Sequence, residues 1–198
     1  MPKVLQNVLY VLTRLKICRM KFFELKSFYI VTDIKEHQEN KIKLLRSIDA
    51  MPQSSLSTTA EQVKTDWNLP EDYKRDYLDI FYDMIRPYMQ EMVERLKCER
   101  WEIHNAWYQV YDKGDRHDWH THARANYTNV YYLSLPNKSI KTQLYDVVSE
   151  SIVENIEVKE GQILTFPAGV IHRSPVNEMD DRKMVISFNS NFQGPCME

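Results

Sequence analysis

The half of the chain that begins at Trp101 consists of short runs of β-forming residues. Val, Ile, Tyr, Phe and Thr are frequent in these runs, and Gly or Pro stands between several of them. Many short strands at such spacing are typical of a sandwich or a barrel. The sequence therefore predicts a mainly β (α+β) protein, with a jelly-roll barrel supported by N-terminal helices. The expected strands are residues 103–111, 127–135, 142–145, 153–158, 162–166 and 183–189.

Two segments before the barrel have the apolar spacing of helices. Residues 35–48 form a charged amphipathic stretch, in which His37 is expected to face solvent. In residues 71–97, Tyr, Met, Ile and Leu recur at steps of three and four, which predicts a long helix packed on the sheet. Pro87 lacks the backbone N–H that a helix interior needs, so it should kink or split this helix.

The rest of the N-terminal half is expected to contain a strand, a loop and an extension. Aromatic and β-branched residues predict a strand at 22–32, whereas Pro, Ser and Thr predict a surface loop at 51–59. Met20 resembles an ordinary start, which makes the preceding residues an extension. The expected organisation is a single domain (1–198), with the extension (1–19), a strand and supporting helices (20–100) and the β-barrel core (101–190).

Charge and cysteine content limit the classes of partner. The net charge is −2, but residues 1–26 hold six Lys or Arg and one Glu, so this segment carries +5 and the rest −7. An acidic barrel half does not indicate a nucleic-acid surface. The apolar run at 4–12 is too short to cross a bilayer, so no membrane partner is expected. Three separated cysteines indicate free thiols in a reducing cytoplasm (the host cytoplasm if the protein is viral), and the oligomeric state is not indicated.

Three histidines of the barrel half are spaced as metal ligands. His120 and His122 are two residues apart, so their side chains would point to the same face of a strand. His172 ends the segment 161–172, whose Gly and Pro residues predict a turn that presents it. Three imidazoles on one side of a metal leave the opposite side open for chemistry. We therefore predict a metal site formed by His120, His122 and His172.

These motifs resemble those of a known enzyme family. Together they look like the two halves of the cupin double-stranded β-helix and, more specifically, like the 2-oxoglutarate and Fe(II)-dependent oxygenases. The sub-family that the chain resembles most has His-x-His where most such enzymes have His-x-Asp/Glu, and it includes phage-encoded members. The resemblance covers about residues 101–190. It is carried by Gly114-x5-His120-x-His122, Gly161-x5-Pro167-x-Gly169-x2-His172, the Tyr111-x2-Gly114 approach, Val130–Leu133, and the closing segment Arg182–Asn189.

The resemblance implies that the three histidines bind Fe(II). Three neutral imidazoles would leave the iron its full +2 charge, which favours a dianionic cosubstrate. Asp118 remains an alternative, because on a regular strand it shares the face of His120 and could ligate the metal or orient an imidazole. His117 has the opposite parity, so we expect it to face away, in a loop role.

The resemblance also implies a buried cation for the far carboxylate of 2-oxoglutarate, about ten residues after the last histidine. Arg182 and Lys183 both stand there. Strand alternation places Lys183 on one face with the Ser187 hydroxyl, whereas Arg182 shares an apolar face, so Lys183 is favoured. A β-bulge would reverse this choice. Tyr132 is the expected tyrosine partner of the cosubstrate, and Tyr111 is the second candidate.

The function that follows is a non-haem Fe(II), 2-oxoglutarate-dependent oxygenase, or hydroxylase, which uses O2 and releases succinate and CO2. Its substrate is expected to be a small molecule or a peptide, and the sequence does not choose between them. A metal-dependent cupin enzyme that does not use 2-oxoglutarate would need no buried cation at 182 or 183. Outside the enzymes, the alternative is a non-catalytic, metal-stabilised binding or structural module of a virus particle.

Overall fold

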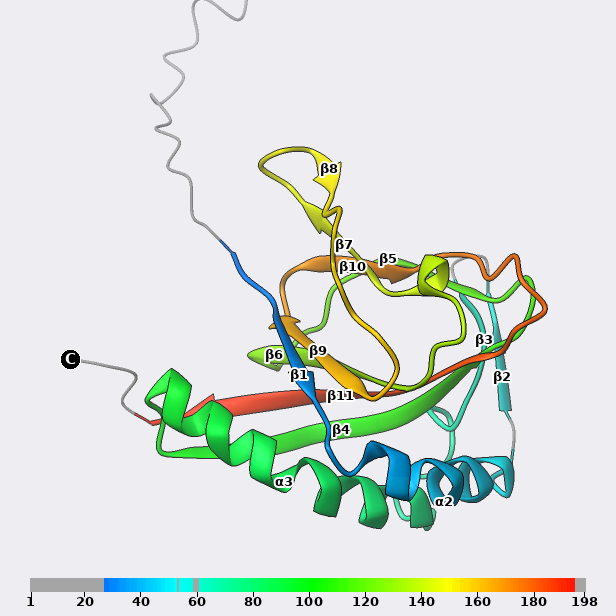
Figure 1. The fold of residues 1–198 in the computed structure, drawn as a ribbon, viewed down its shortest axis with the longest axis horizontal. Helices are drawn as coiled ribbons and strands as arrows, with labels where there is room; N and C mark the ends of the chain where they lie inside the picture. Colours follow the sequence, from blue (N-terminus) through cyan, green and yellow to red (C-terminus); the bar gives the residue numbers. More distant parts are fainter. Residues whose placement is uncertain (1–26, 53, 59–60, 195–198) are drawn as a thin grey trace, which may run out of the picture.

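The computed structural model describes residues 27–52, 54–58 and 61–194 (Figure 1). The extension at 1–19, Cys18, Cys196 and the first part of the strand expected at 22–32 lie outside the described residues. The described helices are α2 (His37–Asp49), α3 (Asp76–Leu96) and the short 3-10 helix η1 (Lys138–Ile140). The described strands are β1 (Ile30–Asp33), β2 (Ser54–Ser57), β3 (Glu61–Thr65), β4 (Arg100–Tyr111), β5 (Arg116–His120), β6 (Tyr127–Ser134), β7 (Gln143–Asp146), β8 (Ser151–Ile152), β9 (Gln162–Pro167), β10 (Ile171–Ser174) and β11 (Lys183–Gln193).

The strands form one antiparallel sheet that curls on itself. Its order is β1-β9-β6-β11-β4-β3-β5-β10-β7-β8, and β2 pairs with β3 at the side. The long strand β11 lies between β4 and β6, while β5, β10 and β7 form the opposite wall of the barrel (Figure 1). This arrangement confirms the expected mainly β architecture with supporting helices.

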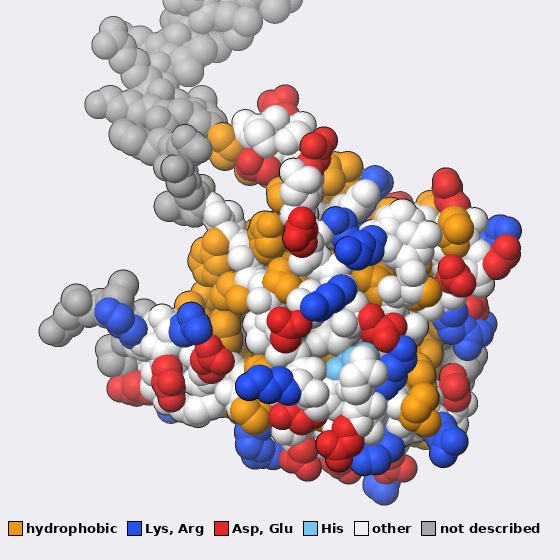
Figure 2. Space-filling model, in the orientation of Figure 1, with side chains coloured by type: hydrophobic (Ala, Val, Ile, Leu, Met, Phe, Trp, Pro, Cys, Tyr) orange, Lys and Arg blue, Asp and Glu red, His pale blue; other side chains and the backbone are white. Residues whose placement is uncertain are grey.

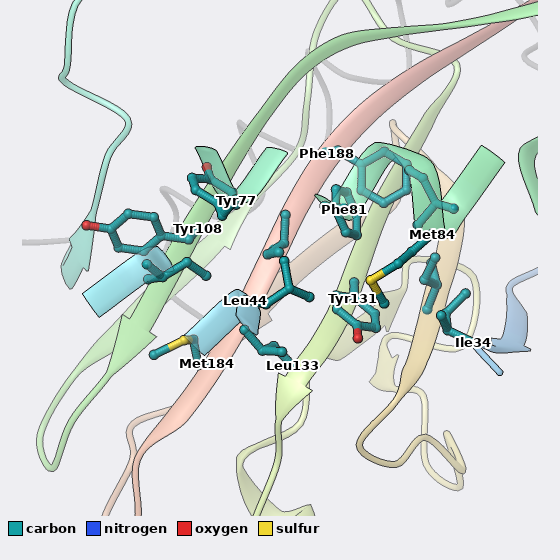
Figure 3. Close-up of a cluster of buried hydrophobic side chains, with 14 of the residues drawn as sticks. Ile34, Leu44, Tyr77, Phe81, Met84, Tyr108, Tyr131, Leu133, Met184 and Phe188 are labelled. Atoms are coloured by element: carbon teal, nitrogen blue, oxygen red, sulfur yellow. The ribbon is translucent and has the colours of Figure 1, made fainter. Parts of the chain in front are cut away.

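Helices α2 and α3 lie against the outer face of the wall made by β4, β11 and β6 (Figure 1). The apolar side chains of α3, spaced at three and four residues, meet the aromatic side chains of the sheet. Figure 3 shows Phe81 and Met84 of α3 among Tyr131 of β6 and Phe188 of β11. The expected split at Pro87 is absent, and α3 is continuous. Buried residues on both sides of that proline, including Ile85 and Met89, hold the helix on the sheet.

The structure corrects several details of the sequence-based fold. The segment 51–59, expected to be a loop, contains β2. Although β2 is rich in serine, its backbone pairs with that of β3. The strand expected at 153–158 is absent: Ile156 and Val158 are buried in the barrel, but this segment has no pairing strand. None of the described helices has the length and apolar character needed to cross a bilayer.

His37 was expected in solvent, and this was wrong. Its side chain is only 3% exposed, with Nδ1 at 2.7 Å from the Tyr131 hydroxyl and Nε2 at 3.4 Å from a carboxylate oxygen of Glu160. Gly161 lies against the ring so closely that an added Cβ would be 3.0 Å from it. The histidine therefore attaches α2 to the sheet.

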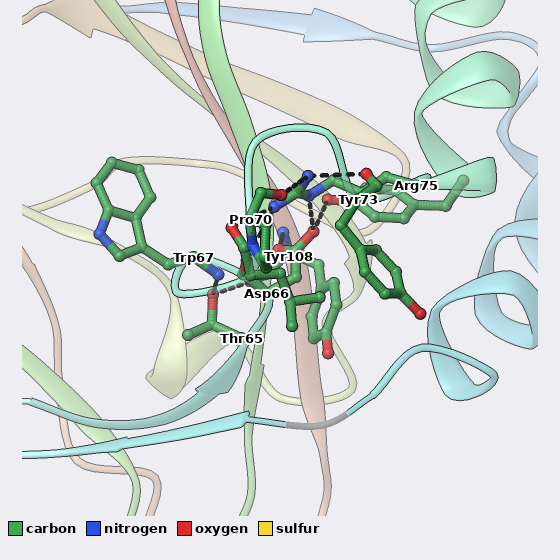
Figure 4. Close-up of polar contacts among 9 residues, drawn as sticks. Thr65, Asp66, Trp67, Pro70, Tyr73, Arg75 and Tyr108 are labelled. Atoms are coloured by element: carbon green, nitrogen blue, oxygen red, sulfur yellow. Dashed lines mark hydrogen bonds and ion pairs between the residues drawn. The ribbon is translucent and has the colours of Figure 1, made fainter.

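A second buried polar group joins the segment after β3 to α3 (Figure 4). Asp66 is fully buried, and its carboxylate accepts hydrogen bonds from Arg75 Nε at 2.9 Å, the Tyr77 hydroxyl at 2.7 Å and the Tyr108 backbone N–H at 3.0 Å. The buried negative charge is thus paired with a cation and with two further donors.

Candidate metal centre and anion pocket

The three predicted histidines converge at one end of the barrel interior. His120 is the last residue of β5, His122 follows two residues later, and His172 lies on β10 directly opposite His120 in the pairing of the two strands. One ring nitrogen from each lies within 4.8 Å of the others. The structure therefore brings together the three residues that the sequence singled out, at a spacing that one metal ion can bridge.

Backbone carbonyl groups orient two of the imidazoles. His120 Nδ1 donates to the Asp118 carbonyl at 2.7 Å, and His172 Nδ1 donates to the Val170 carbonyl at 2.9 Å. Because a carbonyl only accepts, each Nδ1 carries the proton and each Nε2 keeps its lone pair. Such contacts fix the tautomer that binds a metal through Nε2.

The third imidazole is held by a side-chain amide and a stacked ring. His122 Nδ1 lies 3.1 Å from the amide nitrogen of Asn189, which also donates to the Asn105 side chain at 2.9 Å. The ring of Trp107 stacks on His122 with centroids 5.8 Å apart. Because an amide nitrogen only donates, Nδ1 accepts here and the proton of the neutral ring is on Nε2, so metal binding through Nε2 would require the Asn189 amide to turn its oxygen toward Nδ1.

Burial keeps the three imidazoles neutral. Desolvation, followed by the neighbouring His120, lowers the pKa of His172 to about 2 and that of His122 to about 4. Desolvation also lowers the pKa of His120, against a raising effect of its hydrogen bond to Asp118. A neutral imidazole is the form that binds a metal, so no proton has to leave the site at pH 7.

Asp118 does not offer its carboxylate to this centre. The side chain is half exposed and lies 4.0 Å from Arg116. Only its backbone carbonyl contacts the site, through His120. The alternative ligand considered from the sequence therefore acts as an orienting group, by way of the main chain.

Lys183 lies inside the barrel and lines the same cavity as the three histidines. It is 1% exposed, its ammonium donates to the Ser174 hydroxyl at 2.8 Å, and it lies 4.6 Å from the ring centroid of Tyr111. No described carboxylate forms an ion pair with it. Burial lowers the pKa of Lys183 to about 7, since nothing nearby compensates its charge.

Arg182 is placed on the other side of the strand, as alternation requires. Its side chain is 48% exposed and donates to Asp112 at 2.8 Å. Ser187 does line the cavity with Lys183, and its hydroxyl donates to the side-chain oxygen of Gln109 at 3.0 Å. No bulge separates Lys183 from Ser187 in the pairing with β4. In the pairing with β6 a register shift lies between Met184 and Val185, but its extra residue, Leu133, belongs to β6, so Lys183 and Ser187 keep the same face.

The two candidate tyrosines differ in what their hydroxyl groups contact. The Tyr132 hydroxyl accepts from the Thr142 backbone N–H at 3.0 Å, and burial raises its pKa to about 12. Tyr111 lines the cavity, and its hydroxyl shares a hydrogen bond with Ser174, the partner of Lys183. The second choice from the sequence is thus the tyrosine next to the lysine.

His117 was expected to face away, and this was wrong. Its ring stacks on that of His120, with centroids 3.9 Å apart and planes 8° from parallel, and it lines the same cavity. The cause is a bulge: His172 pairs with His120, but Ser174 pairs with His117, so β5 has one extra residue between the pairs. The extra residue resets the alternation on which the expectation depended.

The cavity between the histidines and Lys183 is narrow, about 30 Å³, and free of acidic side chains. Its charged and titratable lining consists of histidines, tyrosine, Arg173 and Lys183. At the Lys183 end, such a lining favours an anion.

Comparisons with known proteins identify the fold. A scan against protein-family models gives no match. A search of curated protein sequences gives none either. Among solved structures, a prolyl-4-hydroxylase from Pseudomonas putida matches with a TM-score of 0.62 and 12% identity, over 85% of this chain and 95% of that one.

Two further structures agree with this likeness. A 2OG-Fe(II) oxygenase family protein from Burkholderia pseudomallei matches with a TM-score of 0.63 and 6% identity, over 82% of this chain and 85% of that one. The alpha-ketoglutarate-dependent epimerase SnoN of nogalamycin biosynthesis matches with a TM-score of 0.63 and 11% identity, over 85% and 81%. The fold is therefore the double-stranded β-helix of the 2-oxoglutarate oxygenases, as expected.

Proposed function

We propose that this protein is a non-haem Fe(II), 2-oxoglutarate-dependent oxygenase. The observation that carries the proposal is one cavity with three neutral imidazoles at one end and a buried, unpaired lysine at the other. Either feature alone has simpler explanations. Together they fit a ligand that chelates a metal and ends in a carboxylate.

The residues present fit an iron ion. Imidazole suits Fe, Zn, Cu and Ni, so the donor set alone does not choose the metal. The choice of Fe(II) is supported by the likeness to iron- and 2-oxoglutarate-dependent enzymes. When bound, iron and 2-oxoglutarate would supply the oxidising chemistry with O2, and succinate and CO2 would be released.

The chain itself would bind, orient and exclude water. Lys183 would bind the far carboxylate of the cosubstrate, with Tyr111 and Ser187 beside it. A carboxylate there would restore the charge of a lysine whose pKa burial has lowered. The Asp118 and Val170 carbonyls would keep His120 and His172 in the metal-binding tautomer.

The proposed substrate is a peptide or a small molecule. One structural neighbour is a prolyl hydroxylase in complex with a peptide fragment and another is the epimerase SnoN in complex with nogalamycin RO, so both classes of ligand occur on this fold. Figure 2 shows acidic and basic side chains interspersed over the visible face, without a large field of one sign. A cytoplasmic location is proposed, as from the sequence.

The test is turnover of 2-oxoglutarate. Aerobic incubation with Fe(II) and 2-oxoglutarate should release succinate and consume O2. A candidate substrate that is hydroxylated should gain the mass of one oxygen atom. His172→Ala should abolish succinate release, whereas His104→Ala, which changes an exposed histidine of β4, should not. Equal succinate release by wild type and His172→Ala would refute the proposal, and O2 uptake without 2-oxoglutarate would favour a cupin enzyme of another kind.

A further inference from the structure

A fourth histidine lies in the cavity between the metal-binding end and the lysine end. In the pairing of β5 with β10, His120 is opposite His172, and His117 is opposite Ser174. Ser174 is the residue that accepts the hydrogen bond of Lys183. The bulge in β5 thus places His117 beside the lysine end while its ring stays stacked on His120.

Hydrogen bonds behind His117 set which nitrogen carries its proton. The Ser187 hydroxyl donates to Gln109 Oε1 at 3.0 Å, so the amide nitrogen of Gln109 faces His117 Nδ1, at 3.3 Å. An amide nitrogen only donates, and the Glu61 carboxylate oxygen, 3.6 Å from the same Nδ1, is beyond hydrogen-bond length, so Nδ1 accepts and the proton of the neutral ring is on Nε2. No described residue forms a hydrogen bond with that Nε2–H, and the ring lines the cavity.

We propose that His117 is a further cosubstrate-binding residue, which donates its Nε2–H to the distal carboxylate of the dicarboxylate beside Lys183. This inference rests on the proposed function, because it concerns the same cavity. Ser187 and Gln109 are positioning residues that orient the His117 ring. The distal carboxylate then has a cationic donor in Lys183 and a neutral donor in His117.

A buried ammonium without a carboxylate partner destabilises the free protein, and a bound carboxylate would offset this cost. The cavity lining contains no acidic side chain, and the hydroxyl of Ser187 is already engaged with Gln109. A carboxylate has about four acceptor positions, which a single ammonium does not satisfy. Ser187 donates to Gln109, and Gln109 donates to His117. The last donor of this series, the Nε2–H of His117, would point to the place where a carboxylate would lie.

The test compares two ligands and two variants of the full chain. His117→Phe keeps an aromatic ring against His120 but has no donor, and His117→Gln keeps an N–H donor but has no ring. Anaerobic calorimetry on the Fe(II)-loaded protein measures binding of 2-oxoglutarate and of oxalate, which chelates a metal but lacks a distal carboxylate. A chelator competition measures Fe(II) affinity itself.

The expected result is a loss that is specific to the dicarboxylate. His117→Phe should weaken 2-oxoglutarate by about tenfold or more, because hydrogen bonds to charged groups are the strong ones. Oxalate and Fe(II) affinities should change by less than about twofold, since neither uses this donor. His117→Gln should recover part of the 2-oxoglutarate affinity.

Two results would overturn the inference: an unchanged 2-oxoglutarate affinity in His117→Phe, or an equal loss for oxalate and 2-oxoglutarate, which would indicate a structural role. Wild-type protein that binds Fe(II) and oxalate but not 2-oxoglutarate would instead refute the proposed function. If His117→Phe does not fold, as checked by circular dichroism, the decision rests on His117→Gln, whose loss must again be confined to 2-oxoglutarate.

Discussion

The two sides of the wall formed by β4, β11 and β6 bury ionisable groups in opposite ways. On the helix side, Asp66 is paired with Arg75 and receives two further hydrogen bonds, and His37 lies between Tyr131 and Glu160. On the barrel side, Lys183 has a hydroxyl but no carboxylate, and His120 and His172 keep Nε2 lone pairs without a metal to accept them. Asp66 and His37 thus have their partners within the chain, whereas on our proposal the histidines and Lys183 find theirs in a metal and an anion.

The buried polar groups on the helix side therefore stabilise the fold, whereas those on the barrel side are suited to binding a ligand. Substitution of one member of a buried ion pair lowers the stability of the protein, because the other charge is left uncompensated. A buried charge without a partner costs stability in the free protein and gains it when a ligand arrives.

The largest loss of stability is expected on the helix side. Asp66→Ala should lower the free energy of unfolding by about 3–5 kcal/mol, because Arg75 and the Tyr108 N–H lose their buried partner. Urea unfolding measures this loss. Asp83→Ala, which removes the exposed pair of α3 with Arg86, is the matched control and should change little. A stable Asp66→Ala protein with weakened 2-oxoglutarate binding would reverse the comparison.

Lys183→Met should have the opposite profile. Affinity for 2-oxoglutarate should fall by about a hundredfold or more, since a buried carboxylate would be left without its cation. The free energy of unfolding of the free protein should stay the same or rise, because an unpaired buried charge is removed. Binding is measured by anaerobic calorimetry. Arg182→Met, which removes the neighbouring exposed cation, should bind 2-oxoglutarate as wild type does.

Acid should destabilise the metal-free barrel through its histidines. The folded-state pKa of His172, about 2, lies below the value of 6.5 of an unperturbed histidine. Its contribution to stability is therefore fully present above pH 6.5 and is lost as the pH falls, by about 1.4 kcal/mol per pH unit. Urea unfolding between pH 7 and pH 4 should show a shallower decline for His172→Leu than for wild type or His104→Ala. Equal slopes for all three would contradict the assignment.

The smallest effect distinguishes the two tyrosines. Tyr111→Phe should weaken 2-oxoglutarate by a few-fold, roughly 1 kcal/mol, because its hydroxyl lies with Ser174 at the lysine end. Tyr132→Phe should leave binding unchanged and cost a similar amount of stability, since its hydroxyl accepts from the Thr142 N–H. Calorimetry and urea unfolding on both variants check this, and a reversed pattern would restore Tyr132 as the cosubstrate partner.

The sequence predicted those features that depend on local spacing. His120 and His122 share a direction because they are two residues apart, and Lys183 and Ser187 share a face because β11 has no extra residue between them. The turn before His172 follows from its Gly and Pro residues. Strand alternation and turn chemistry are enough for these positions.

The features that the sequence missed depend on long-range pairing. His117 entered the cavity through a bulge that only the register with β10 reveals, and His37 was buried by contacts with Tyr131 and Glu160, which are distant in sequence. Ser-rich β2 formed because β3 was available to pair with it, and residues 153–158 formed no strand because no partner was. Composition does not encode which segment lies next to another.

The most direct test of the central claim is the visible absorption band of the anaerobic protein with Fe(II) and 2-oxoglutarate. Chelation of iron by the keto acid should give a weak charge-transfer band in wild type, which His172→Ala should lose and Lys183→Met should show only at much higher 2-oxoglutarate concentration. A band that is unchanged in His172→Ala, or absent from wild type, would contradict the claim that the three histidines and the unpaired lysine form one site.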